Sequence, residues 1–406
     1  MQSHSVRGRR LGGGESLNNA GQLTASDGRP CHVSPPSDRI LAFTPQLPTA
    51  EALLPYLKLI DESRIYSNHG PLVMALQERL QALFAQAASA VLATSSGTAA
   101  LVAGILAHAG RATAERPYAL CPGYTFVATA GAVEQCGYQP YLADVSPSTW
   151  TLDPEALIDH PMLEKVGVVV PVCAYGRPID VEHWARFQDE TGVSVVIDAA
   201  AAFEAVADGR MRCHVDIPLA LSFHATKVFA SGEGGCLLWA DPLQAIRAFQ
   251  SINFGFFGSR NSQVSSFNGK MSEYHAAVGL AELDGLSGKL AGFGRTVELY
   301  RQSFVRHGLA VESLVSHPAV ASNYILYDAG DEARCTTLRS AMDDADIETR
   351  LWYGGGLHTH DYLADCRRDR LDVTATLSSQ LLGLPMATTL SAEQVDRVVT
   401  TIRQSD

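Results

Sequence analysis

The sequence predicts a three-layer α/β fold, in which helices cover both faces of a seven-stranded, mostly parallel sheet. Seven short apolar runs are more continuous than half-exposed strands would be, and strands buried on both faces of a parallel sheet have this pattern. Helical patterns at 98–108, 126–134 and 181–190 separate several of these runs. The apolar runs are residues 91–95, 118–122, 140–145, 166–172, 194–198, 219–223 and 235–239.

A tail and two domains are expected along the chain. Residues 1–40 are rich in Gly, Ser, Asn, Pro and Arg without periodicity, which predicts a disordered N-terminal tail. This tail is either an unstructured leader or the product of an over-extended start, with a transit peptide as a further alternative. Residues 41–275 are expected to form a large domain. After Met271 a long helical stretch precedes shorter mixed elements, which predicts a smaller C-terminal α+β domain at 276–406.

Composition excludes several classes of protein. The 406 residues are 46% hydrophobic and 18% charged, as in globular proteins. The net charge of −12, with no basic stripe, argues against a nucleic-acid partner. No stretch approaches the ~18 apolar residues of a membrane span, so no membrane partner is predicted. The eight cysteines form no CxxC pair, which favours reduced core thiols in a cytoplasmic protein.

A candidate phosphate site follows the first apolar run. Ser96, Gly97 and Thr98 open an apolar helix, where free backbone N–H groups and the positive end of the helix dipole favour an anion. An ordinary N-cap with a glycine at the turn is the alternative. Ser222, at the end of a later strand, is expected to give its hydroxyl to the same phosphate.

Asp198 and Lys227 together indicate pyridoxal phosphate. Asp198 ends a buried strand, and the carboxyl ends of such strands face the crevice where ligands bind. Lys227 lies in a small, polar loop after another strand, ahead of a glycine-rich segment. The cofactor needs one amine for a Schiff base and one carboxylate at its ring nitrogen, where a contact pair gains about 4 kcal/mol. The alternatives are a helix-capping aspartate and a surface lysine.

Two further groups have a structural and a functional interpretation. Phe126 follows the second strand and is expected to stack on a flat cofactor, although an aromatic residue there is usually part of the core. His358 and His360 resemble a spaced pair of metal ligands. No third ligand follows from the spacing, so no metal is predicted and substrate contact is preferred.

From about residue 60 to residue 403, the chain resembles the DegT/StrS family of sugar-nucleotide aminotransferases. The matching segments are Asn68-His69-Gly70-Pro71, Ser96-Gly97-Thr98-Ala99-Ala100-Leu101, residues 122–129, Val170-Pro171-Val172 with Tyr175-Gly176, Asp198-Ala199-Ala200, residues 222–227 with Glu233-Gly234-Gly235, Asn253-Phe254-Gly255-Phe256 and Asn268-Gly269-Lys270-Met271-Ser272-Glu273.

The resemblance implies fold type I of the pyridoxal phosphate enzymes, with the cofactor in the large domain. It implies Lys227 as the Schiff-base lysine, Asp198 at the pyridine nitrogen and Phe126 against the ring. Gly97, Thr98 and Ser222 would hold the phosphate, and Asn268 would reach the phosphate of the neighbouring subunit in a homodimer with shared active sites.

One position departs from the family pattern, and one position excludes a branch of the family. Ala201 stands where the family usually has Gln or His beside the cofactor, which puts details of cofactor tuning in doubt. Family dehydrases carry His at the position of Lys227, so the lysine argues against that branch.

The resemblance implies transamination from an amino acid, expected to be L-glutamate, to the keto group of a nucleotide-linked 4-keto-6-deoxy sugar, in polysaccharide or secondary-metabolite biosynthesis. Asn68, Lys270 and His358 are the candidate contacts to the nucleotide-sugar substrate. Amination of a 3-keto sugar or a cyclitol ketone is one alternative, and a non-catalytic, cofactor-binding regulator is another.

Overall fold

The computed structural model describes residues 16–17, 23–24, 39–85, 87–242 and 244–405. Contacts divide the chain into two units, Met1–Arg39 and Ile40–Asp406. In the first unit, β1 (Ser16–Leu17) pairs antiparallel with β2 (Leu23–Thr24). The predicted disordered tail at 1–40 otherwise falls almost entirely outside the described residues, so it stays a prediction.

Six of the seven apolar runs form one strand each in the second unit, and the run at 194–198 forms two. Five strands pair in the order β13-β5-β4-β6-β7 and four in the order β3-β10-β9-β8, and all pairs are parallel except those of β10. The predicted α/β fold with a mostly parallel sheet is therefore confirmed. The strands are β3 (Ala90–Thr94), β4 (Tyr118–Pro122), β5 (Gln139–Ala143), β6 (Val166–Val169), β7 (Ser194–Val195), β8 (Ile197–Asp198), β9 (Leu219–Ser222), β10 (Gly235–Trp239) and β13 (Arg367–Arg368).

The two sheets adjoin at residues 194–198. The Val196 N–H donates to the Val169 carbonyl in the five-stranded sheet, at 3.1 Å, and the Ile197 N–H donates to the Pro218 carbonyl beside β9, at 3.0 Å. A parallel bridge also joins Val172 to Asp198. The carboxyl ends of β6, β8 and β9 consequently lie at one edge, as the binding crevice of a parallel sheet requires.

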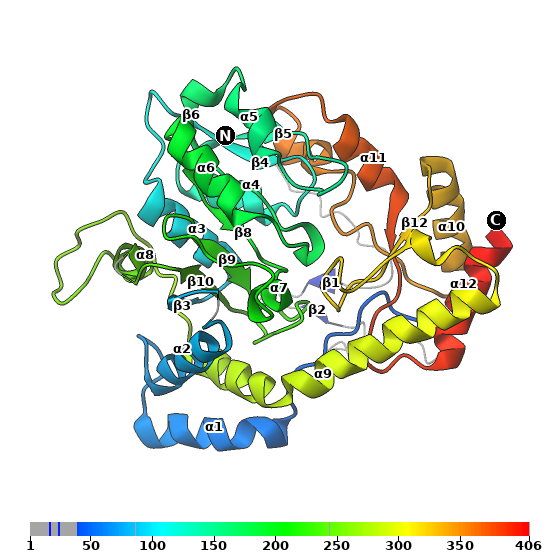
Figure 1. The fold of residues 1–406 in the computed structure, drawn as a ribbon. Helices are drawn as coiled ribbons and strands as arrows, with labels where there is room; N and C mark the ends of the chain where they lie inside the picture. Colours follow the sequence, from blue (N-terminus) through cyan, green and yellow to red (C-terminus); the bar gives the residue numbers. More distant parts are fainter. Residues whose placement is uncertain (1–15, 18–22, 25–38, 86, 243, 406) are drawn as a thin grey trace, which may run out of the picture. The chain divides into compact units, whose positions relative to one another are not determined.

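Helices cover both faces of this sheet region (Figure 1). Alternate side chains of a strand enter two different clusters: Leu120 belongs to the cluster that contains residues of α2 and α6, whereas Ala119 and Cys121 belong to the cluster that contains residues of α3, α4 and α8. Continuous apolar runs follow from this two-sided burial. The helices are α1 (Ala50–Ser63), α2 (Pro71–Leu83), α3 (Gly97–His108), α4 (Ala128–Gln135), α5 (Pro154–Ile158), α6 (Val181–Thr191), α7 (Phe203–Ala207) and α8 (Gln244–Ile252).

The C-terminal part has a hydrophobic cluster of its own. The helix α9 (Glu273–Arg306) begins beside α2 and reaches α12 (Ala392–Ser405), as Figure 1 shows. Its second half packs on a three-stranded sheet and two helices. These elements are β11 (Leu314–Val315), β12 (Leu326–Asp328), β14 (Leu381–Gly383), α10 (Glu332–Asp344) and α12, with α11 (Asp372–Gln380) following β13. Because contacts join Ile40–Asp406 in one unit and α9 crosses residue 275, the division into two domains stays a proposal.

Within the described ranges, no helix combines the length and the apolar character that crossing a membrane would need. Seven cysteines in these ranges are unpaired, and Cys31 lies outside them.

Candidate active site

The predicted phosphate residues meet where β3 leads into α3. Ser96 caps the helix through its hydroxyl, and Gly97 and Thr98 are its first two residues, whose N–H groups lack intrahelical acceptors. A β-carbon on Gly97 would lie 2.5 Å from Cβ of Ser222, at the end of β9. A β-carbon on Gly235 would lie 2.7 Å from the Gly97 nitrogen. The glycines thus leave room for a small cradle of N–H and hydroxyl groups at the helix N-terminus.

Asp198 lies beside this cradle at the end of β8 and is 7% exposed. Its Oδ2 accepts a hydrogen bond from the Thr129 hydroxyl at 2.8 Å, and its Oδ1 accepts one from the Ala200 N–H at 3.1 Å. Burial raises the pKa of Asp198, whereas these two hydrogen bonds and the charge of Lys227 lower it. Ala202, not Asp198, precedes α7, so Asp198 is not the cap of that helix.

Lys227 is half-buried in the loop between β9 and β10. The loop is closed by its own backbone, because the Lys227 N–H donates to the His224 carbonyl at 2.8 Å. The buried amide of Asn323 also holds the loop by donating from Nδ2 to the Thr226 carbonyl at 2.9 Å. Within the described parts of the chain, the Lys227 amine has no hydrogen-bond partner, and its charge acts on Asp198. The amine is therefore available to a ligand beside the carboxylate.

An exposed ring and an aromatic cluster complete the surroundings of Asp198. Phe126 is 58% exposed, so it is not the core residue that the structural interpretation expected. Tyr124 and Tyr175 are buried, with their hydroxyls 3.0 Å apart, and the hydroxyl of Tyr353 accepts a hydrogen bond from the Tyr175 N–H at 3.1 Å. Ala201 is buried in this cluster and presents no polar group.

Lys270 and His69 lie close together near the end of β3. Lys270 bridges to Thr94, and its Nζ lies 4.2 Å from the ring centroid of Phe254. Among the described residues, neither Nζ of Lys270 nor Nε2 of His69 has a hydrogen-bond partner, although both atoms are buried. Burial lowers the pKa of Lys270, and burial with the charge of Lys270 lowers the pKa of His69 to about 4.

The other predicted substrate and partner residues are Asn68, Asn268 and His358. Asn68 and Asn268 are exposed, and neither side chain forms a hydrogen bond within the described chain. His358 lies near the end of β4, because the Leu357 N–H donates to the Gly123 carbonyl at 2.9 Å. Its buried Nδ1 has no hydrogen-bond partner among the described residues, and burial lowers its pKa.

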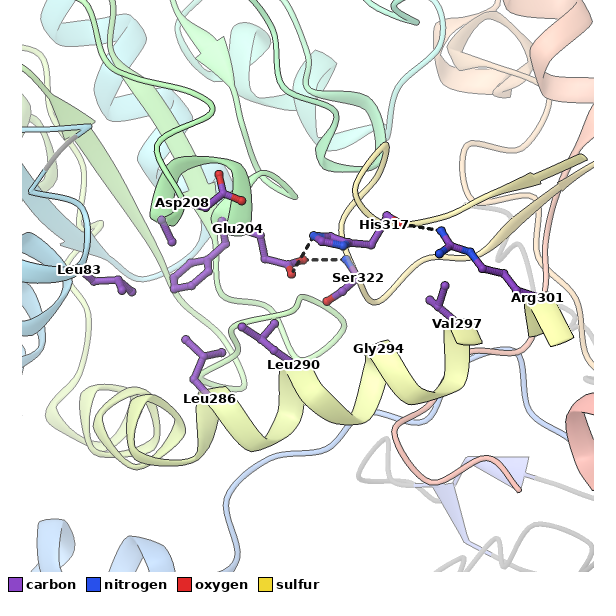
Figure 2. A pocket seen from close by; sticks show the side chains of 12 residues that line it. Leu83, Glu204, Asp208, Leu286, Leu290, Gly294, Val297, Arg301, His317 and Ser322 are labelled. Carbon is purple, nitrogen blue, oxygen red and sulfur yellow. Dashed lines mark hydrogen bonds and ion pairs between the residues drawn. The ribbon is translucent and has the colours of Figure 1, made fainter. Parts of the chain in front are cut away.

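A separate pocket of about 540 Å³ lies between α7 and α9. Figure 2 shows Glu204, His317 and Ser322 turned toward one another, with Leu286 and Leu290 of α9 on the other side. Glu204 accepts a hydrogen bond from the Ser322 N–H at 2.7 Å. None of the predicted site residues lines this pocket. Across the described ranges, no group of three or more His, Cys, Asp or Glu side chains is arranged to hold a metal ion.

Sequence reasoning missed the threonines and the asparagine that hold the two central residues. Thr125 and Thr129 lie in a matched segment, but their approach to Asp198 depends on the position of β4 relative to β8 in the sheet. Asn323 comes from a distant part of the chain. Only the polarity of these residues at the end of a strand or in an apolar run could have drawn attention to them.

The residues present fit pyridoxal phosphate. A phosphate fits the glycine cradle at the start of α3, a ring nitrogen fits the buried carboxylate of Asp198, and an aldehyde fits the unpartnered amine of Lys227. The exposed ring of Phe126 can cover a flat group.

Relatives of known sequence agree with this assignment. The model of the DegT/DnrJ/EryC1/StrS aminotransferase family matches residues 49–403. Protein Rv3402c of Mycobacterium tuberculosis is 30% identical over 382 residues, which cover 91% of this chain and 90% of the relative. The dTDP-4-amino-4,6-dideoxy-D-glucose transaminase of Shigella dysenteriae is 28% identical, over 90% of this chain and 98% of that enzyme.

Solved structures share the fold. A Bacillus cereus protein assigned as a pyridoxal phosphate-dependent aminotransferase has a TM-score of 0.80 at 28% identity, over 90% of this chain and 99% of the other. DesI, crystallised with its TDP-sugar product, has a TM-score of 0.78 at 28% identity, over 91% and 93%. The chain belongs to the DegT/DnrJ/EryC1/StrS aminotransferase family, and it is a pyridoxal phosphate-dependent aminotransferase.

Proposed function

We propose that this enzyme transfers an amino group from an amino acid, L-glutamate, to the keto group of a nucleotide-linked 4-keto-6-deoxy sugar, for polysaccharide or secondary-metabolite biosynthesis. The observation that carries the proposed chemistry is the unpartnered amine of Lys227 beside the buried carboxylate of Asp198. The Shigella relative, named for a 4-amino sugar, supports the 4-position. A Pseudomonas aeruginosa relative named for a 3-oxo sugar is 24% identical and covers 66% of this chain.

Lys227 and Asp198 would divide the chemistry between them. When bound, pyridoxal phosphate supplies the aldehyde that takes up the amino group and the ring that accepts electron density. Lys227 would hold the cofactor through its amine, and it would carry a proton to and from the reacting substrate carbon. Asp198 would accept a hydrogen bond from the protonated ring nitrogen, and Phe126 would cover the ring.

The phosphate site is proposed to be shared between two subunits. Gly97, Thr98 and Ser222 bind the phosphate through N–H and hydroxyl groups. Asn268 is exposed and has no hydrogen bond within the described chain, so its amide is free to reach the phosphate of a second subunit. The nearby rings of Phe254 and Phe257 are 47% and 50% exposed, which supports an interface at this surface.

Three residues are proposed to contact the nucleotide sugar. Lys270 suits a diphosphate, because its buried amine lacks a hydrogen bond among the described residues. His358 offers an unpartnered ring nitrogen near the end of β4, and Asn68 offers an exposed amide.

The adjoining strands and the separate C-terminal cluster support fold type I as a further proposal. When β7 and β8 are counted as one strand, the five-stranded and four-stranded sheets would together form one seven-stranded sheet, with β13 as an additional edge strand. The second half of α9 and the residues after it would form the smaller domain, with a core of its own. The cytoplasmic location stays a prediction.

Replacing Lys227 with Ala tests the transaminase assignment. We expect the K227A variant to lose turnover by at least about a thousandfold and to lose the visible absorbance of the bound cofactor, since no other amine takes its place. The matched control is K165A, which removes an exposed lysine and should behave as the wild type. Retained turnover in K227A would reject the proposed role of Lys227.

Substrate assays distinguish the sugar classes. The purified enzyme, loaded with cofactor and L-glutamate, should aminate dTDP-4-keto-6-deoxyglucose faster than the corresponding 3-keto sugar or a cyclitol ketone. A faster reaction with either of the latter would contradict the 4-position. Cofactor binding without a half-reaction with any amino acid would instead identify a regulatory protein.

A further inference from the structure

We propose that Thr129 and Thr125 are positioning residues that keep the Asp198 carboxylate ionised and directed at the cofactor ring. This inference rests on the proposed function, in which Asp198 binds the ring nitrogen. Thr129 Oγ1 lies 2.8 Å from Asp198 Oδ2, and Thr125 Oγ1 lies 3.0 Å from Thr129 Oγ1. Thr125 is 2% exposed and Thr129 1%, so water does not replace either hydroxyl.

The chemistry of the groups gives this chain of hydrogen bonds one direction. An ionised carboxylate can only accept hydrogen bonds, so the single hydroxyl proton of Thr129 is committed to Asp198. The Thr129 oxygen can then only accept from the other hydroxyl, so Thr125 must donate. The order is Thr125 to Thr129 to Asp198, and each donated bond polarises the next hydroxyl and strengthens the bond after it.

This relay opposes the effect of burial on Asp198. Burial favours the neutral acid, and the Thr129 hydroxyl favours the charged form, as does the Ala200 N–H on the other oxygen. Each carboxylate oxygen has about two acceptor sites. One site on each oxygen is used, so each oxygen keeps an acceptor site for a ligand, and the two hydrogen bonds fix the plane of the carboxylate from both ends.

Other titratable groups around Asp198 cannot do the same work. Lys227 faces Asp198 from the loop after β9 and favours its charge. Three other groups interact electrostatically with the carboxylate: Cys121 on β4, Cys173 after β6, and Tyr353. Burial raises the pKa of each of them, so they stay neutral at physiological pH. The threonine relay is therefore the side-chain support of the carboxylate that does not itself titrate.

The central test is the Thr129→Val variant, which keeps the shape of the side chain and removes the hydroxyl. Affinity for pyridoxal phosphate is measured by protein fluorescence from pH 5 to pH 9. Without the donor the pKa of Asp198 rises, so we expect the acid-side loss of affinity to move up by about one pH unit. At neutral pH the affinity should fall about tenfold.

Three further variants separate positioning from packing. Thr129→Ser keeps the hydroxyl and should retain the wild-type midpoint, although it removes a buried methyl group. Thr125→Val should move the midpoint in the same direction by less. Thr151→Val is the matched control, because Thr151 is also buried and its hydroxyl has no partner among the described residues. Circular dichroism verifies that each variant is folded.

The outcomes distinguish this inference from the proposed function. If Asp198→Asn binds the cofactor as tightly as the wild type, Asp198 does not hold the ring and the proposed function loses its basis. If Asp198→Asn loses affinity but Thr129→Val keeps the wild-type midpoint, the relay alone is rejected. A midpoint shift in Thr129→Ser as large as in Thr129→Val would assign the effect to packing and also reject the relay.

Discussion

Burial and neighbouring charges shift the pKa values of individual side chains at this site. His69 is the clearest case outside the cofactor residues, because its ring packs on Phe249 at a centroid distance of 4.8 Å and lies within the field of Lys270. Both effects oppose protonation of the imidazole. Lys270 also has no nearby anionic partner among the described residues. Its charge therefore suits a negatively charged substrate group.

His69 makes folding stability depend on pH in a definite window. Its pKa is lowered from 6.5 to about 4, so between these values the unfolded chain binds more protons than the folded one. The stabilisation is fully present above pH 6.5 and is lost as the pH falls toward about 4. Denaturant unfolding should show a smaller loss over this window in the His69→Gln variant.

His183→Gln is the control for this prediction, because His183 is exposed on α6. Its unfolding free energy should follow the wild-type pH dependence. A His69→Gln profile identical to the wild type between pH 4 and pH 6.5 would contradict the assigned burial of the ring.

At the scale of elements, α9 begins by capping another helix. The carboxylate of Glu273 is 1% exposed and accepts hydrogen bonds from the N–H groups of Leu72 at 2.7 Å and Val73 at 3.0 Å, in the first turn of α2. These donors have no acceptors within α2. The negative charge of Glu273 also interacts favourably with the positive end of the α2 dipole. The side chain of Glu273 therefore fixes the position of α9 relative to α2, beside His69 and Lys270.

Replacing Glu273 with Gln should lower the unfolding free energy by about 2 kcal/mol, since only one of the two acceptor oxygens and none of the charge remains. Thermal and denaturant unfolding measure this effect. Glu78→Gln, an exposed substitution on α2 itself, is the control and should change stability by less than about 0.5 kcal/mol. Equal losses in the two variants would argue against the cap.

The elements were largely predictable, and the contacts between them were not. Continuous apolar runs predicted the strands, because burial on both faces leaves no alternation of polar residues. Asp198 and Gly97 could be proposed as site residues because they stand at the end of a strand and at the start of a helix, and Lys227 could be proposed because it lies in the loop after β9. The hydrogen bond from Thr129 was not predictable, since it joins α4 to the end of β8, and only the order of the strands brings these two elements together.

At the scale of the whole molecule, the proposed active site needs a second copy of the chain. In the proposal, the residues around Lys227 provide an amine, a carboxylate and part of a phosphate site, and the exposed side chain of Asn268 reaches the site of the other subunit. A closed two-fold dimer places such a residue in the partner's site and receives the same residue in return. Two defective chains of different kinds can then repair each other.

Mixing the K227A and N268A variants tests this sharing. Each variant alone should be inactive or strongly impaired. After subunit exchange, each mixed dimer has one site with both residues intact, so a 1:1 mixture should regain about a quarter of wild-type activity. Mixing K227A with the control K165A should give activity only from intact Lys227 sites, without dependence on exchange time. No gain in the first mixture would show that Asn268 serves its own subunit or none.

The close approach of Gly97 to Ser222 also limits which codons this gene can carry. A methyl group at position 97 would overlap the serine Cβ at 2.5 Å, whereas one at Gly131, on α4, would meet nothing within 4 Å. In a library randomised at both positions, cells are selected under conditions in which growth requires the product that the enzyme makes. Only glycine should survive at position 97, whereas position 131 should accept alanine and larger residues. The geometry around Gly97 is therefore enough to prevent its replacement during evolution.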